Sequence, residues 1–181
     1  MNTCSLKRFE GTSCHRRLPV LTLLLVALTA FPGVARAAEP GGNQTFVITA
    51  HQLDGTGRVV AVGPFNGAGE YRLLNQQANP DGTSTDTDEF DLPDGKVFFT
   101  DTYTVVLRPA GESCTWLIQI EGTYTVTGGT GAFTGVTGGG TFTASGVFVA
   151  ARDEAGNCLQ LDVPPVSFSE VVTGTGTTTL P

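Results

Sequence analysis

The stretch that decides the fold is GTYTVTGGTGAFTGVTGGGTF, residues 122–142. Strand-forming residues enter and leave this stretch, and seven glycines lie between positions 128 and 140. Glycine reaches backbone conformations that other residues avoid, and it lets chain segments pack closely. Two apolar residues, Phe133 and Val136, stand among these glycines. We therefore predict a tight, twisted connection between two strands, with Phe133 tucked beneath it.

The chain on both sides of this stretch has the pattern of an all-β protein. Thr, Val, Phe and Gly dominate, and turn residues recur about every ten positions. No long segment after residue 37 repeats its apolar residues at helical spacing. Eight short strands fit an up-and-down antiparallel barrel, which leaves no exposed sheet edge. The predicted strands span residues 45–53, 58–62, 69–76, 83–90, 96–108, 115–127, 141–153 and 166–178, and the tail from 173 is either a last strand or a frayed end.

The first 37 residues have the pattern of a secretory signal peptide. Four basic residues precede a mostly apolar run, LPVLTLLLVALTAF at 18–31, and Ala35-Arg36-Ala37 supplies a small-x-small cleavage pattern. Such a run is short for a membrane-spanning helix. We therefore expect a secreted protein whose mature part, residues 38–181, is a single β-barrel domain with no membrane segment.

Removal of residues 1–37 changes the charge of the chain. It leaves five of the ten basic residues and sixteen of the seventeen acidic ones, for a net charge near −11. A surface of this sign repels nucleic acid and anionic membranes. We expect no nucleic-acid partner, and we expect the charge to serve solubility.

Two cysteines remain after the signal, Cys114 and Cys158. In an oxidising compartment a disulfide between them is the default, and two cysteines without a nearby histidine make a poor metal site. If Thr127 pairs near Thr141 in a hairpin, Thr115 comes near Asp153, and the two cysteines lie at the open end of that hairpin. The sequence predicts the Cys114–Cys158 bridge and no metal ligand set.

Alternation of side chains along the strands predicts which residues face the barrel interior. Two acids interrupt the apolar inward faces: Asp101 lies between Phe99 and Tyr103, and Glu170 lies two residues after Phe168. A buried carboxyl must be paired, hydrogen-bonded or neutral. A raised-pKa acid beside tyrosines is a candidate for proton transfer, with Asp101, Glu170 and Tyr103 as the catalytic candidates, although a slip in register or a bulge would turn either acid to solvent. The expected lining of a ligand lumen is aromatic: Tyr71, Phe99, Trp116, Tyr124 and Phe168.

A second group of acids is concentrated between residues 81 and 94. Oxygen-rich loops can hold calcium, but this spacing matches no known calcium loop, and a solvated acidic turn is the simpler interpretation. No Gly-x-Ser-x-Gly or P-loop motif is present, so hydrolase and nucleotide-binding classes have no support. The acids are Asp81, Asp86, Asp88, Glu89, Asp91 and Asp94.

The glycine stretch resembles the Gly-Gly-Thr-Gly-x-Phe-x-Gly-x-x-Gly signature of the allene oxide cyclase and dirigent barrel superfamily. Residues 88–97 and 114–129 are similar to secreted bacterial relatives of that barrel. The resemblance implies an eight-stranded antiparallel barrel, often trimeric, that works without a metal or organic cofactor. Plant members cyclise a fatty-acid epoxide or guide the coupling of phenoxy radicals. No catalytic residue of that family can be matched to a position in this chain.

Two functions follow as hypotheses. In the first, the barrel lumen binds, and isomerises or cyclises, a small apolar ligand without a cofactor. In the second, the protein is a non-catalytic extracellular binding or structural module with an acidic, Thr-rich surface. An open lumen with inward carboxyls favours the first, and a filled interior with a prominent exposed patch favours the second.

Overall fold

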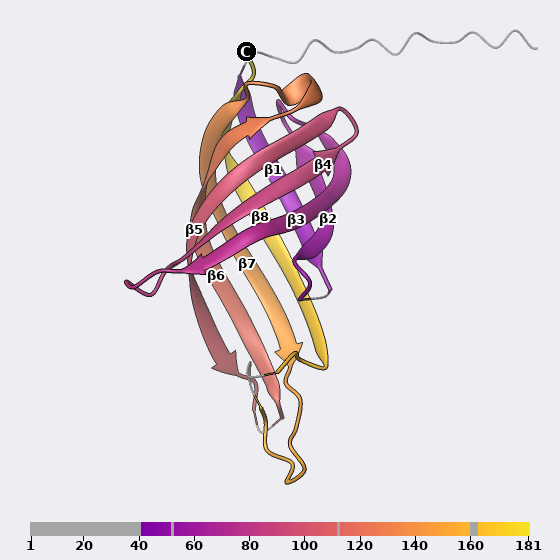
Figure 1. The fold of residues 1–181 in the computed structure, drawn as a ribbon, viewed down its shortest axis with the longest axis vertical. Helices are drawn as coiled ribbons and strands as arrows, with labels where there is room; N and C mark the ends of the chain where they lie inside the picture. Colours follow the sequence, from indigo (N-terminus) through magenta and orange to yellow (C-terminus); the bar gives the residue numbers. More distant parts are fainter. Residues whose placement is uncertain (1–40, 52, 112, 160–162) are drawn as a thin grey trace, which may run out of the picture. The chain divides into compact units, whose positions relative to one another are not determined.

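Eight antiparallel strands follow one another around a closed barrel (Figure 1). The computed structural model describes residues 41–181 except 52, 112 and 160–162, and the expected signal peptide lies outside the described residues. Each strand pairs with the next in sequence, and β8 pairs with β1 to close the sheet. The predicted eight-stranded up-and-down barrel is therefore confirmed. The strands are β1 (Gly42–Ala50), β2 (Thr56–Val62), β3 (Gly67–Ala78), β4 (Ser84–Leu92), β5 (Gly95–Pro109), β6 (Thr115–Gly129), β7 (Thr137–Val149) and β8 (Ser167–Thr179).

The outer face of the barrel is rich in threonine. β-branched residues suit a pleated surface that is half exposed to water, and threonine pairs across strands add to sheet stability. One row of six threonines runs across β4, β5, β6, β7, β8 and β1, each directly opposite the next. The row is Thr85, Thr102, Thr123, Thr141, Thr175 and Thr45.

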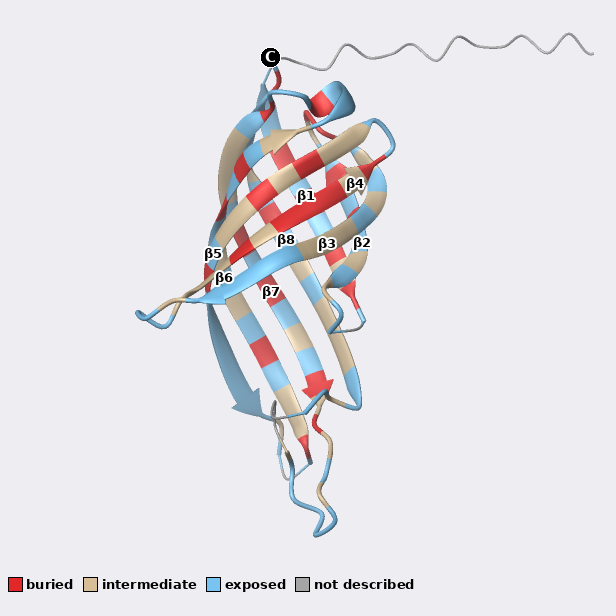
Figure 2. Cartoon of the chain, viewed as in Figure 1, coloured by how far each residue is buried: buried red, intermediate tan, exposed pale blue. Residues whose placement is uncertain are grey.

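One end of the barrel is closed by the glycine stretch. Its centre forms a short 3-10 turn, Gly131–Phe133, and Phe133 is buried beneath the connection, as predicted. Val136 is buried there as well. Phe65 from the β2–β3 loop lies against Phe133 with ring centroids 6.4 Å apart. Leu180, just past β8, is buried in the same cluster. The closed end appears in Figure 2 as buried residues near the C-terminus.

A fully buried glutamine fixes the β2–β3 loop at this closed end. The Gln44 amide donates from Nε2 to the carbonyls of Val62, at 3.1 Å, and of Phe65, at 3.0 Å. The Phe65 backbone N–H donates back to Gln44 Oε1 at 3.2 Å. Because each of these buried groups is paired, the loop is held rigidly over the core.

The Thr/Gly tail is a full strand, β8, which pairs with both β1 and β7. Gly174 in this strand faces the ring of Phe46, and a Cβ at position 174 would overlap that ring. Glycine is therefore required where the aromatic core approaches the sheet most closely. The alternative of a frayed tail is wrong.

Two strand positions and one register differ from the sequence-based expectation. β1 begins and ends three residues earlier than predicted, and β7 begins and ends four residues earlier than predicted. Thr141 pairs with Thr123 rather than near Thr127, and Thr115 pairs with Val149 rather than Asp153. The physical reason is that Gly138, Gly139 and Gly140 belong to β7, so the connection is shorter than the glycine stretch.

The disulfide between Cys114 and Cys158 forms as predicted, although the chain path that brings the two cysteines together differs from the predicted hairpin. The Ala150 N–H donates to the carbonyl of Cys114 at 2.7 Å, which continues the β6–β7 ladder. A turn at 153–157 then reverses the chain, and Arg152 pairs with Cys158. The two cysteine Cα atoms lie 5.4 Å apart. The bridge therefore anchors the β7–β8 loop to the start of β6.

The opposite end of the barrel is formed by longer strands. β5, β6, β7 and β8 extend beyond the other four strands (Figure 1). A second apolar cluster lies there, built on Cys114, Ile118, Phe148 and Ala150. Within the described ranges, no helix has the length and apolar character needed to cross a membrane.

Candidate functional site

The barrel contains a partly open cavity of about 360 Å³, and every strand contributes to its lining. Ligand pockets in proteins measure about 300–1,000 Å³. Aromatic and aliphatic side chains form most of the wall, among them Phe46, Phe90, Phe99 and Phe142. Leu53 and Gly55 of the β1–β2 loop line it as well, at the end opposite the glycine stretch. The cavity therefore lies beside the packed aromatic core, which fills the end of the barrel that the glycine stretch closes.

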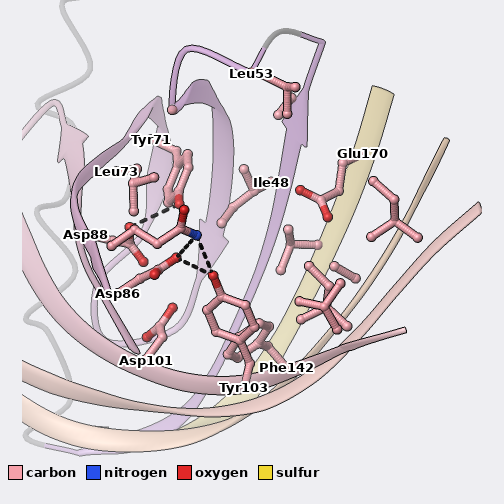
Figure 3. Close-up of a pocket in the computed structure, with 18 of the residues that line it drawn as sticks. Ile48, Leu53, Tyr71, Leu73, Asp86, Asp88, Asp101, Tyr103, Phe142 and Glu170 are labelled. Atoms are coloured by element: carbon pink, nitrogen blue, oxygen red, sulfur yellow. Dashed lines mark hydrogen bonds between the residues drawn. The ribbon is translucent and has the colours of Figure 1, made fainter. Parts of the chain in front are cut away.

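Three carboxyl groups gather on one wall of this cavity (Figure 3). Asp86 and Asp88 are on β4, and Asp101 is on β5. Tyr71 Oη donates to Asp88 Oδ1 at 3.0 Å, and Tyr103 Oη donates to Asp86 Oδ2 at 2.8 Å. The group is called the carboxyl cluster below: Asp86, Asp88 and Asp101 with the hydroxyls of Tyr71 and Tyr103.

Strand register explains how the cluster assembles. Asp86 and Asp88 share the inward face of β4 with Phe90, because side chains two apart lie on one face of a strand. Asp101 lies directly opposite Asp86 across β4 and β5. Cβ atoms of such opposite residues are about 4.5–5.5 Å apart. The sheet therefore forces the two acids into close proximity.

A bulge in β3 adds a polar side chain to the same wall. The register between β3 and β4 shifts between Leu73 and Asn75, and this shift places Gln76 opposite Asp86. Gln76 Nε2 donates to Tyr103 Oη at 2.7 Å and to Asp86 Oδ2 at 3.4 Å. Bulges re-aim side chains in this way next to functional sites. Gln76 therefore orients the Tyr103 hydroxyl toward Asp86.

The cluster sits in surroundings that disfavour negative charge. Burial, then the charge of Asp88 and a hydrogen bond to it, raise the pKa of Asp101 to about 9. Burial is also the main cause that raises the pKa of Asp88 to about 6, against hydrogen bonds from Asp101 and Tyr71 that lower it. Burial raises the pKa of Asp86, and it raises the pKa of Tyr71 and Tyr103. At neutral pH Asp101 therefore holds a proton beside its more acidic neighbour.

Some polar atoms of this wall have no partner among the described residues. Asp86 is 7% exposed, yet its Oδ1 accepts no hydrogen bond there, and the buried Oδ1 of the half-buried Asp101 accepts none either. The hydroxyl of Tyr124, deeper in the core and opposite Asp101 in register, is likewise unpaired. Buried polar atoms are nearly always partnered, so these atoms call for an explanation.

Glu170 lies on β8, across the lumen from the carboxyl cluster (Figure 3). Burial raises the pKa of its carboxyl. The structure thus places both sequence-predicted acids on the lumen wall but does not bring them together. Asp101 and Tyr103 share the cluster wall, and Glu170 faces it alone.

The five aromatic residues expected in the lumen divide into two groups. Tyr71, Phe99 and Phe168 line the cavity. Trp116 instead stacks on Phe148, with ring centroids 6.2 Å apart and planes within 6°, and Tyr124 packs into the core against Phe46. Neither Trp116 nor Tyr124 is part of the cavity wall. Position on an inward face therefore does not by itself give contact with the lumen.

The interpretation of residues 81–94 as a solvated acidic turn or calcium loop is wrong for its central part. Residues 84–92 form β4, which places Asp86 and Asp88 in the lumen. Glu89 points to the other face, where Lys96 Nζ lies 2.8 Å away and Arg72 Nη1 lies 3.3 Å away. In the described part of the chain, no three His, Cys, Asp or Glu side chains are arranged to hold a metal ion.

Sequence reasoning missed Asp86, Asp88 and Gln76 as lumen residues. Alternation anchored on Phe90 and Leu92 would have found the two acids, since all four lie on one face of β4.

Comparisons with protein-family models, curated proteins and solved structures found no match. The resemblance to the allene oxide cyclase and dirigent superfamily therefore rests only on the residues of the glycine stretch and of segments 88–97 and 114–129, and it stays a prediction.

Proposed function

We propose that this protein binds a small, largely apolar molecule in its barrel lumen, with the carboxyl cluster holding the polar end of that molecule. The observation that carries the proposal is the cavity of about 360 Å³ with apolar walls and one hydrogen-bonding wall. Binding sites for small molecules commonly combine a mostly apolar lining with a few convergent polar groups. The disulfide supports an extracellular location, where such a bridge persists.

Proton transfer on the bound molecule is a second candidate, and the carboxyl pair favours it. Asp101 keeps its proton at neutral pH while Asp88 titrates near that range, so one acts as the acid and the other as the base. Such a pair suits an isomerisation or cyclisation, which moves protons without net change in oxidation state. A trimeric assembly and membership of the allene oxide cyclase and dirigent superfamily are parts of the same proposal, supported by the glycine stretch.

The open lumen weighs against the alternative of a purely structural module, for which the expected interior is filled. The Thr-rich outer face agrees with either function, because solvated strands favour threonine in any barrel. The cavity is the feature that distinguishes the two.

Isothermal titration with 1-naphthalenemethanol tests the proposed function. We expect binding with a Kd between about 10 μM and 1 mM, in the range typical for a ligand of this size. Ala144 lines the cavity, so Ala144→Phe places a ring inside it and should weaken binding at least about tenfold. The neighbouring Ser145 faces outward, and Ser145→Phe is the matched control that should bind normally.

Two results would count against ligand binding in the lumen. One is the absence of heat with the wild-type protein at millimolar ligand. The other is equal affinity in the Ala144→Phe variant, provided that its circular dichroism spectrum matches that of the wild type.

A further inference from the structure

We propose that the molecule bound in the lumen carries a cationic amine on an apolar body, and that the amine contacts Asp86 and Asp101. This inference rests on the proposed function and specifies its ligand class.

The charge of the cavity wall is the first observation. Four carboxyl groups line the lumen, and none of its described lining residues is Lys, Arg or His. An apolar wall raises the strength of the field from such groups and concentrates ligands of the opposite sign. The wall therefore attracts a cation and opposes a carboxylate. The four are Asp86, Asp88, Asp101 and Glu170.

The unpaired acceptors are the second observation. Tyr103 and Gln76 both donate to Oδ2 of Asp86, which leaves the buried Oδ1 without a donor. Asp101 Oδ1 is also buried without a donor, and Asp101 lies directly opposite Asp86 across β4 and β5. An ammonium group carries three donors and no acceptor. An ammonium group can therefore supply the donors that these carboxyl oxygens lack, and such bonds would be charge-assisted.

Size and lining define the rest of the ligand. A dry cavity of about 150 Å³ holds benzene. A cavity of about 360 Å³ therefore has room for a two-ring body with a short aminoalkyl arm. Aromatic rings such as Phe90 and Phe99, whose centroids are 4.4 Å apart, supply both apolar contact and attraction for a cation.

Proton linkage follows from the groups that face this wall. They are Asp86 and Asp88 of β4, Asp101 and Tyr103 of β5, Tyr71 of β3 and Tyr124 of β6, with Glu170 across the lumen. Burial, together with the charge of Asp88, raises the pKa of Asp101 to about 9, so Asp101 retains its proton at neutral pH. An ammonium group would replace such a proton. Binding of an amine should therefore release a proton, and its affinity should rise from pH 5.5 to 8.

The test compares three ligands with one apolar body: 1-naphthylmethylamine, 1-naphthalenemethanol and 1-naphthoate. Titration calorimetry of the full protein at pH 7.5 should give an amine affinity at least about tenfold above that of the alcohol, and naphthoate at least about tenfold below it. Repeating the amine titration in buffers of different ionisation enthalpy should show net proton release, while the alcohol shows none.

Two neutralised variants locate the contact. Asp86→Asn and Asp101→Asn should each weaken amine binding about tenfold and change alcohol binding less than about twofold. Glu121 is exposed on the outer face of β6, so Glu121→Gln removes one negative charge without touching the cavity. This control should leave both affinities unchanged.

Other outcomes would refute either the amine ligand or the proposed function as a whole. Equal affinity for amine and alcohol, or preference for naphthoate, refutes the amine while keeping ligand binding. Failure of all three ligands refutes the proposed function itself. If the variants do not fold, proton release by the wild-type protein decides the question, and its absence refutes the amine contact.

Discussion

Removal of the Cys114–Cys158 bridge has an effect that can be calculated from its position in the chain. The cysteines are 44 residues apart. On the chain-entropy model, a crosslink that closes a loop of this length stabilises the fold by about 4 kcal/mol. An unfolding entropy of about 2.1 cal/mol/K per residue over about 140 residues then converts this loss to a Tm lower by about 10–15 °C.

Thermal unfolding followed by circular dichroism measures this shift. The wild-type protein should be compared with and without reductant, because reduction breaks the crosslink and keeps both sulfur atoms in place. Cys114 is buried beside Ile118 and Phe148, so the double variant Cys114→Ala, Cys158→Ala loses packing in addition and should melt slightly lower than reduced wild type. A difference below about 3 °C between oxidised and reduced protein would refute the loop-closure reasoning.

Three further substitutions test the packing and electrostatics of the barrel. Gln44→Leu leaves the buried backbone groups of Phe65 unpaired, and chemical denaturation should show a loss of about 2–4 kcal/mol. Gly174→Ala pushes the ring of Phe46 toward the lumen, and calorimetry should show weaker binding of 1-naphthalenemethanol together with a loss of about 1–3 kcal/mol. Asp101 has a folded-state pKa raised to about 9, so the folded protein keeps a proton that the unfolded chain loses near pH 4. The free energy of unfolding of the wild type should therefore fall as the pH rises from 4 to 9, and Asp101→Asn removes this contribution. The stability of the variant relative to wild type should thus rise with pH in urea titrations, and a constant difference would contradict the raised pKa.

The barrel and one wall of its lumen could be predicted because strand alternation is a local property. The apolar neighbours Phe99 and Tyr103 are enough to place Asp101 on the inward face of β5. In β4 the sequence also predicts a strand, over residues 83–90, but the high density of acids favoured a solvated position for Asp86 and Asp88. The apolar anchors Phe90 and Leu92 carry more information than composition there, because one buried face determines the orientation of the whole strand.

Other features depend on contacts between strands and leave no clear mark on the sequence. Gln76 reaches the carboxyl cluster only because a bulge between Leu73 and Asn75 reverses the alternation in β3. The β6–β7 register differs by four residues because Gly138–Gly140 is part of a strand, whereas consecutive glycines usually indicate a loop. These glycines are tolerated since neighbouring backbone lies where a side chain would otherwise project.

Strand β4 carries acids on both faces, and the two faces differ in the charges that surround these acids. On the outer face, Glu89 is buried but lies within 4 Å of the cationic groups of Lys96 and Arg72. On the inner face, Asp86 and Asp88 are equally buried, and no described residue of the lumen wall supplies a positive charge. Burial of carboxyls without a cation costs stability, and sequences keep such violations mainly where function needs them. Neighbouring strands place cations on the outer face beside Glu89, and none of the described lining residues does so on the inner face. This contrast within one strand is the observation that favours the proposed cationic ligand over a neutral one.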